Sequence, residues 1–185
     1  MTLKLKFNSI RSLSEARYAA AMMADFAGFR MDPAHAETLS AAKIQEIIAW
    51  INGPMCTGEF PPGSFVETMM DSISVLGMEA VEAAPEQDLD VPWILPFEPG
   101  IRPASPHSIL HAPSVELYLK HKQEYPPETL WMVNITQADP NQTEWLEFSR
   151  PYAVSIDGMG EEAPGLTDFT LWDSWMDVLE PFKEV

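Results

Sequence analysis

The sequence is poor in basic residues and in cysteine. Lysine and arginine together number 11 against 28 aspartates and glutamates, which gives a formal net charge of -17. Nucleic-acid phosphates and anionic membrane surfaces repel such a chain, so we expect neither as a partner. The single cysteine, Cys56, has no second cysteine with which to form an internal disulfide. We expect Cys56 to be a small buried apolar side chain in a reducing compartment.

The sequence also has no long apolar run. No uninterrupted apolar stretch reaches the roughly 20 residues that a transmembrane helix requires, and residues 1–6 lack the apolar run of a signal peptide. We therefore expect a soluble, cytoplasmic protein. Because 46% of its 185 residues are hydrophobic and the composition shows no break, we expect one domain over residues 1–185.

Two common signatures of ligand sites are missing. A dinucleotide-binding sheet normally carries G-x-G-x-x-G in its first turn, whereas this chain has Asn-Ser-Ile-Arg at residues 8–11. None of the helices that we expect carries a His-x-x-x-His pair, and the cysteine and histidines do not follow a zinc-ligand spacing. We expect no metal site and no cofactor.

What the sequence does contain is a repeated strand and helix unit. Strand-like segments begin near residues 3, 26, 54 and 78, a period of about 25 residues. The helices between them begin at serine caps, which are Ser12 with Glu15, Ser40, and Ser64 with Glu67. This period requires parallel strands joined by right-handed crossovers.

We predict an α/β fold, a parallel (β/α)8 barrel of the TIM type in a shortened form. Seven to eight such units fill 185 residues, slightly fewer than the roughly 200 of small barrels. The Pro-rich stretch 85–113 has room for strands at 91–97 and 108–112 but little helix, so one or more helices should be missing there. The remaining elements are expected as a helix over 115–124, a strand over 130–136, a short helix over 141–148, a strand over 152–157 and a closing helix from about Asp168.

Two segments of the chain resemble phosphoribosylanthranilate isomerase, a barrel enzyme of the tryptophan pathway. In the first, Lys-Phe-Asn-Ser-Ile-Arg at 6–11 is similar to the family's K-x-C-G-I-T, and Ala-Gly-Phe-Arg at 27–30 to its L-G-F-x-F. In the second, residues 150–168 are similar to R-P-x-x-V-D-V-S-S-G-V-E-x-x-P-G-x-K-D without a gap. The resemblance covers rather more than half of the chain and implies the same barrel fold.

The family reaction is an Amadori rearrangement of an aminoaldose phosphate, which needs a base and an acid. The resemblance implies a cysteine base at the end of the first strand and an aspartate acid at the end of the sixth. Asn8 stands at the cysteine position, and a carboxamide does not take up a proton at physiological pH. His111 is the candidate for the acid position, and Glu82 is an alternative base.

The resemblance also implies a phosphate site in the glycine-rich turns after strands seven and eight. Thr136-Gln137 replaces the first Gly-Gly, and residues 157–159, Asp-Gly-Met, replace Ser-Ser-Gly. Asp157 adds a negative charge where a phosphate dianion would lie. The candidate ligand-binding residues are Arg30, Thr136, Gln137, Ser155, Asp157, Gly158 and Met159.

Barrel geometry places further charged residues at the ends of the other strands, where such enzymes have their active sites. We expect Arg30, Asp32, Glu59, Glu82 and Arg102 at this mouth. Arg30 can pair either with a substrate carboxylate or with one of the neighbouring acidic residues.

Three functional hypotheses follow from the sequence. The first, which we prefer, is a divergent isomerase-like barrel that has lost the family reaction and binds a small molecule at the C-terminal face of the barrel, or a protein partner. The second is an active aldose-ketose or sugar-phosphate isomerase with relocated groups, such as Glu82 or His111 as base. The third is an interaction module without a pocket, which a measurement of self-association in solution would test. Under each hypothesis the protein can also form a homodimer.

Overall fold

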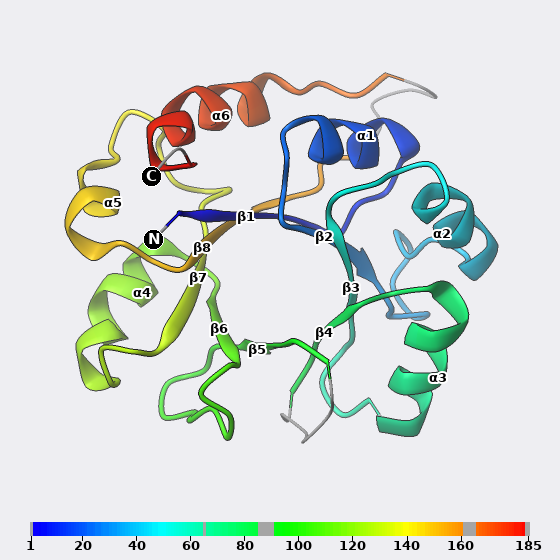
Figure 1. The fold of residues 1–185 in the computed structure, drawn as a ribbon, viewed down its shortest axis with the longest axis horizontal. Coiled ribbons are helices and arrows are strands. Elements are labelled where there is room, and N and C mark those ends of the chain that lie inside the picture. The colour runs from blue at the N-terminus through cyan, green and yellow to red at the C-terminus, as the bar shows by residue number, and fades with distance from the viewer. Residues whose placement is uncertain (1, 65, 85–90, 161–165, 184–185) are drawn as a thin grey trace.

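The computed structural model describes residues 2–64, 66–84, 91–160 and 166–183 of the chain. Within these ranges, eight parallel strands close into a barrel in chain order, and β8 pairs with β1 (Figure 1). The strands are β1 (Lys4–Asn8), β2 (Phe26–Arg30), β3 (Met55–Glu59), β4 (Ala80–Glu82), β5 (Trp93–Pro96), β6 (Ile109–Ala112), β7 (Leu130–Asn134) and β8 (Ala153–Asp157). The predicted parallel (β/α)8 barrel is confirmed.

The helices form a ring around the strands, as Figure 1 shows. They are α1 (Leu13–Ala21), α2 (Ala41–Ile48), α3 (Val66–Leu76), α4 (Val115–His121), α5 (Glu144–Ser149) and α6 (Thr170–Lys183), with a 3-10 turn, η1 (Lys122–Glu124), after α4. Residues 97–108, between β5 and β6, contain no helix. A helix is therefore missing in the Pro-rich stretch, as predicted. Residues 85–90 of that stretch lie outside the described ranges.

Side-chain caps fix where several of the helices begin. The predicted capping box at α1 is present, because the Glu15 N–H donates to Ser12 Oγ (3.1 Å) and the Ser12 N–H donates to Glu15 Oε2 (3.1 Å). Ser40 caps α2 through the Lys43 N–H. The hydroxyl of Ser64 donates to the Pro61 carbonyl (2.8 Å), and residue 65, within the third predicted cap, lies outside the described ranges.

The main core lies between the outside of the barrel and the helices. From the closing helix α6, the side chains of Trp172, Trp175 and Leu179 are completely buried. The Trp172 ring lies 4.4 Å, centroid to centroid, from Phe7 of β1. Because helices cover the outside of the barrel while side chains fill its inside, its strands are buried on both faces, as is usual for parallel sheets.

The inside of the barrel divides into an apolar and a polar part. We call the apolar part the floor; it lies toward the N-terminal ends of the strands and consists of Phe26, Ile94, Ile109, Met132 and Ala153. Because side chains alternate along a strand, the next inward positions lie one layer higher. There the buried residues are polar and include Lys6, Thr57 and Ser155. Above them lies the C-terminal mouth of the barrel.

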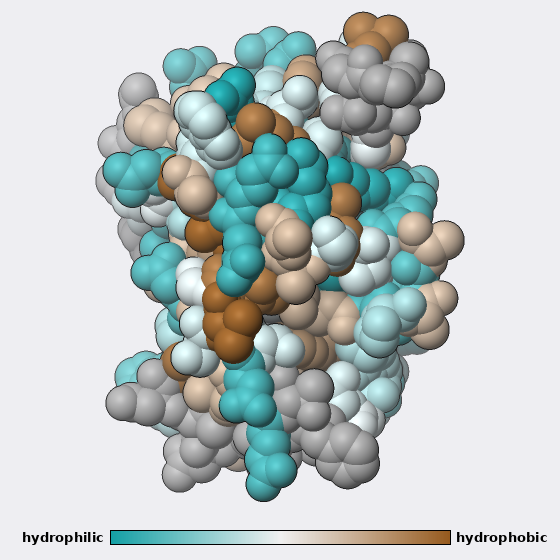
Figure 2. Space-filling view, turned by 90° about the vertical axis from the view of Figure 1, so that its right-hand side faces the viewer, coloured by the Kyte–Doolittle hydropathy of each residue, from teal (hydrophilic) through white to brown (hydrophobic). Residues whose placement is uncertain are grey.

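None of the described helices is long and apolar enough to cross a membrane. Figure 2 shows the face that carries α2 and α3, where apolar side chains stand in small groups between hydrophilic ones.

Candidate functional site at the barrel mouth

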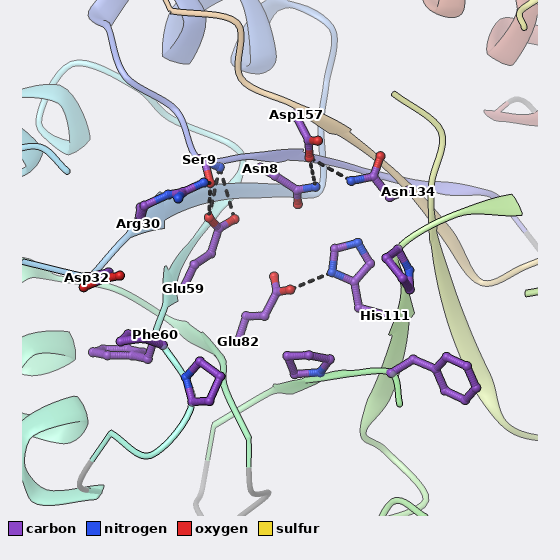
Figure 3. Close-up of a pocket in the computed structure, with 15 residues that line it drawn as sticks. Asn8, Ser9, Arg30, Asp32, Glu59, Phe60, Glu82, His111, Asn134 and Asp157 are labelled. Carbon is purple, nitrogen blue, oxygen red and sulfur yellow. Dashed lines mark hydrogen bonds and ion pairs between the residues drawn. The ribbon is translucent and has the colours of Figure 1, made fainter. Parts of the chain in front are cut away.

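The C-terminal ends of the strands surround a cavity of about 430 Å³. This volume lies within the roughly 300–1,000 Å³ of small-molecule sites. Seven strands end on a residue that lines it, and β6 contributes its penultimate residue. These residues, most of them labelled in Figure 3, are Asn8, Arg30, Glu59, Glu82, Pro96, His111, Asn134 and Asp157. Ser9, Asp32, Phe60, Pro61, Pro62, Phe97 and Pro113 complete the lining.

Lys6 joins the polar groups beneath this cavity. Its completely buried ammonium group donates to Asn8 Oδ1 (2.6 Å), Glu59 Oε1 (2.6 Å) and Glu82 Oε2 (2.5 Å). An ammonium group has three N–H donors, so all of them have partners. Burial by itself lowers the pKa of Lys6, but Glu59 and Glu82 more than offset this, and the pKa lies above its ordinary value.

Gly28 of β2 makes room for this ion pair. A Cβ atom at that position would lie 1.8 Å from Glu59 Oε1 and 3.0 Å from Lys6 Nζ. Any larger residue at position 28 would therefore displace the Glu59 carboxylate from Lys6.

Glu82 extends the network to His111 and Ser155. Its Oε1 lies 2.6 Å from His111 Nδ1, and His111 Nε2 lies 2.7 Å from Ser155 Oγ. Burial raises the pKa of Glu82, but the charges of Lys6 and then His111 outweigh it, so the pKa is well below its ordinary value. Both carboxylate oxygens and both ring nitrogens therefore have partners within the protein.

A serine, a histidine and a carboxylate in line also form the triad of many hydrolases. In this protein Ser155 is completely buried, and it is not among the residues that line the cavity. A ligand in the cavity therefore cannot reach its hydroxyl. The row of three side chains holds His111 in place beside the cavity and does not expose a nucleophile.

Asn8, at the expected position of the base, is held on both sides. Its Oδ1 accepts from Lys6, and its Nδ2 donates to Asp157 Oδ1 (2.8 Å). Asn134 Nδ2 donates to the same Asp157 oxygen (2.8 Å; Figure 3). The Asn8 side chain thus links the Lys6 network to Asp157 and has no group that titrates in the neutral range.

The two turns expected to bind phosphate are tied to each other and to β1. Thr136 Oγ1 accepts from the Asp157 N–H (2.7 Å), and the Gly158 N–H donates to the Asn8 carbonyl (2.7 Å). A Cβ atom on Gly158 would lie 2.5 Å from the Ser9 carbonyl oxygen, so only glycine fits this approach. Gln137 is exposed to solvent.

Glu15 fills the anion-binding position of the turn after β8. Its Oε1 accepts from the N–H groups of Met159 (2.7 Å) and Gly160 (2.8 Å). Its Oε2 accepts from the N–H groups of Arg11 (2.7 Å) and Ser12 (3.1 Å). Successive N–H groups of this kind form a nest for an anion. Here the anion is the protein's own carboxylate, which is completely buried.

The structure brings together some of the predicted residues and separates others. Seven of them line the cavity: Asn8, Arg30, Asp32, Glu59, Glu82, His111 and Asp157. Ser155 lies beneath the cavity, whereas Thr136, Gln137, Gly158 and Met159 lie in the turns and are not part of its lining. Arg102, expected at the mouth, lies over the ring of Tyr125 (4.1 Å) and lines a separate cavity.

Sequence reasoning missed the roles of Lys6, Glu15 and Asn134. It also missed Ser9, whose N–H and hydroxyl donate to Glu59 Oε2 (3.0 and 2.7 Å). Lys6 alternates with leucine and phenylalanine, a pattern that does not distinguish a solvent-facing lysine from one that points into a barrel. The S-x-x-E spacing identified Glu15 only as a helix cap. Asn134 had a usable signal, since it lies two residues before the end of the strand predicted over 130–136, in a fold whose strand ends form the site.

The described residues contain no group of three or more histidine, cysteine, aspartate and glutamate side chains arranged to hold a metal ion. The cation to which Glu59 and Glu82 are both bound is the ammonium group of Lys6.

The chain was compared with known proteins by sequence. No protein-family model matches it, and no curated protein matches it significantly.

Comparison of structures does find similar proteins. Phosphoribosyl anthranilate isomerase from Thermus thermophilus has a TM-score of 0.75 at 17% sequence identity, covering 97% of this chain and 99% of that one. TrpF from Jonesia denitrificans also has a TM-score of 0.75, at 14% identity and with 97% and 98% covered. The isomerase from Thermotoga maritima has 0.67 at 15% identity, with 97% and 99% covered. The chain therefore has the barrel fold of the phosphoribosylanthranilate isomerases, which confirms the resemblance found in its sequence at the level of the fold.

Proposed function

We propose that this protein is an isomerase-like barrel that does not isomerise phosphoribosylanthranilate and instead binds a small polar molecule at its mouth. Fold alone does not decide function; an aldolase, the phospho-2-dehydro-3-deoxyheptonate aldolase of Thermotoga maritima, also superposes with a TM-score of 0.62 at 9% identity. The proposal therefore depends on the side chains of the mouth.

The main support for the proposal is Asn8, which stands at the position of the family's catalytic base. A general base must hold a free lone pair that takes up a proton near neutral pH. Asn8 offers a carboxamide whose oxygen accepts from Lys6 and whose nitrogen donates to Asp157. Neither atom is suited to remove a proton from a sugar carbon.

Glu82 and His111, the two groups proposed from the sequence as a relocated base, are both held within the network. Glu82 is held in its ionised form by Lys6 and His111, and its lowered pKa makes it a weak base. The His111 ring has Glu82 on one nitrogen and Ser155 on the other. Proton transfer to a ligand would first require this network to open.

The turns around the mouth also argue against a sugar phosphate. One structurally similar isomerase, with a TM-score of 0.69 and 15% identity over 97% of this chain and 99% of that one, holds reduced 1-(o-carboxyphenylamino)-1-deoxyribulose 5-phosphate. In this chain, Glu15 occupies the backbone N–H groups of the turn after β8. Asp157 adds a further carboxylate at the cavity wall. Two carboxylates disfavour a phosphate dianion in the same place.

The cavity itself supports a binding role. It has the volume of a small-molecule site, and its lining combines apolar surface from Phe60, Phe97 and four prolines with polar and charged side chains. The polar network holds those groups in fixed positions, which reduces the entropic cost of binding.

Two measurements on the purified protein test the proposal. With phosphoribosylanthranilate as substrate, we expect no turnover above the buffer rate. With inorganic phosphate, we expect the amide NMR signals of Met159 and Gly160 to stay unchanged, because Glu15 already holds both N–H groups. Enzyme-like turnover, or saturable phosphate-dependent shifts of these two signals, would contradict the proposal.

A further inference from the structure

Arg30 is the polar group of the mouth with most of its hydrogen-bonding capacity unused. Among the described residues its guanidinium group makes no ion pair, and its hydrogen bond is to Ser9 Oγ at 3.3 Å. A guanidinium group has five N–H donors, so most of those of Arg30 have no acceptor among the described residues. The side chain lines the cavity and is partly exposed.

The carboxylate nearest in register does not neutralise Arg30. Arg30 and Glu59 are paired residues on β2 and β3. The Glu59 carboxylate is turned instead toward Lys6 through Oε1 and toward the backbone and hydroxyl of Ser9 through Oε2. Because Lys6 and Ser9 hold this carboxylate, Arg30 is left to pair with an anion from outside.

Two carboxylates of the mouth have spare acceptor capacity: Asp157, which ends β8 on the other side of β1 from Arg30, and Asp32, which follows β2 on the Arg30 side. The Oδ1 atom of Asp157 accepts from two amide groups, and no described residue donates to its Oδ2. Asp32 is similar, since its Oδ1 accepts from the Ala34 N–H and its Oδ2 has no donor among the described residues. Figure 3 shows Arg30 and Asp157 on opposite sides of Asn8. Their strands, β2 and β8, both flank β1, so they are two strand spacings apart, roughly 9–10 Å.

These free groups restrict the charge of a ligand. A dianion such as phosphate would meet Arg30 but also Asp157 and Asp32. A simple amine would satisfy an aspartate but leave the Arg30 charge without a partner. A molecule with a carboxylate at one end and an amine at the other satisfies both sides, since guanidinium and carboxylate pair through two parallel hydrogen bonds.

Resting on the proposed binding function, we infer that the mouth binds a compact amino carboxylate, with its carboxylate on Arg30 and its ammonium group on Asp157. Arg30 gives the site its specificity for the acid end. The separation of β2 and β8 sets the length of the ligand.

A chain-length series of probes tests this inference. Glycine, β-alanine, 4-aminobutyrate and 5-aminopentanoate are titrated into the full-length protein by calorimetry, with butyrate, butylamine and inorganic phosphate as matched controls. We expect one or more of the longer amino carboxylates to bind at least about 10-fold more tightly than each control, as two charge-assisted contacts replace one.

Variants of Arg30 and Asp157 locate the binding site. Arg30→Gln should weaken the best probe by about 10-fold or more, and Arg30→Lys should recover only part of this, because lysine lacks the planar fork. Asp157→Asn keeps an oxygen for Asn8 and Asn134 but loses the charge, so it should weaken the amino carboxylate and not butyrate. Arg102→Gln, in the separate cavity, is the matched control and should bind like wild type.

Three results would overturn the inference. One is that no member of the series binds; another is that butyrate or butylamine binds as tightly as the amino carboxylates. The third is that Arg30→Gln, with the wild-type melting temperature, binds the best probe with unchanged affinity. None of these requires isomerase turnover, so the proposed loss of that reaction is judged separately by the substrate assay.

Discussion

The floor and the mouth are two parts of the same barrel interior, and their side chains have opposite character. The floor is apolar, and its five residues are at most 5% exposed. Burial of such side chains contributes about 1.5–3 kcal/mol for each large one. The mouth and the layer beneath it hold Lys6, Glu59 and Glu82 as a buried ion network, whose desolvation largely offsets its Coulomb attraction. Stability therefore comes from the floor and the outer core, while the charges of the mouth suit a ligand.

The largest expected effect is on the mouth, from removal of its central cation. Lys6→Met leaves Glu59 and Glu82 buried beside each other without a counter-charge, which should lower the free energy of unfolding by about 3–5 kcal/mol. Urea unfolding measures the change. Lys43→Met, which removes the exposed pair with Glu46, is the matched control and should stay within about 0.5 kcal/mol. Equal effects of the two variants would show that the Lys6 network is not a buried one.

The floor should respond to lost apolar volume rather than to a lost charge. Met132→Ala creates a cavity at a completely buried position and should lower the free energy of unfolding by about 2–5 kcal/mol. Because no floor residue is ionised, the loss should be the same at pH 4 and pH 7. A strong pH dependence of this loss would mean that the floor and the mouth are not independent.

A single added methyl group should disturb the mouth. Gly28→Ala pushes the Glu59 carboxylate away from Lys6, and we expect a loss of about 1–3 kcal/mol by urea unfolding. In a Glu59→Ala background the added methyl group meets no carboxylate, so the same change should be close to neutral. Equal losses in both backgrounds would contradict the clash seen at Gly28.

Acid should weaken the mouth before the floor. The folded-state pKa of Glu82 lies below its unfolded value, so the carboxylate contributes stability that is complete above about pH 4.3 and is lost as the pH falls toward the folded-state pKa. We expect the free energy of unfolding to decrease over this acid range, and to decrease less steeply in Glu82→Gln. Parallel curves for the wild type and Glu82→Gln would show that Glu82 does not titrate as described.

The smallest effect concerns Cys56 of β3, which lies in the outer core. Burial, followed by the nearby charge of Glu79, raises the pKa of this thiol to about 11, and the side chain is 4% exposed. Native protein at pH 8 should therefore react with iodoacetamide far more slowly than protein unfolded in urea. Stoichiometric labelling of the native protein within minutes would contradict this.

The comparison also shows what could be predicted from the sequence. The repeat of strand-like segments and the serine caps of the helices located the strands and most of the helices, because both are local sequence signals. The strand ends Asn8, Arg30 and Glu82 followed from the fold, since all strands of a parallel barrel end at one edge. These residues needed no knowledge of side-chain contacts.

The contacts within the site could not be predicted in the same way. Glu15 meets the Met159 and Gly160 N–H groups across about 145 residues of chain, and no local pattern encodes this contact. The burial of Lys6 could not be predicted, because alternating apolar and polar residues distinguish the two faces of a strand but do not show that both faces are buried. In the Pro-rich stretch the strands could be predicted from their apolar runs. The course of the loop between them could not be predicted, so the predicted position of Arg102 was wrong.

We propose that the whole mouth, and not only the base position at Asn8, is unsuited to the isomerase reaction. The most direct test is the rate at which Asn8→Cys, compared with wild type, converts phosphoribosylanthranilate. With Glu15 in the anion nest and Asp157 at the wall, we predict that neither protein exceeds the buffer rate. Enzyme-like turnover by wild type, or by Asn8→Cys alone, would contradict the account.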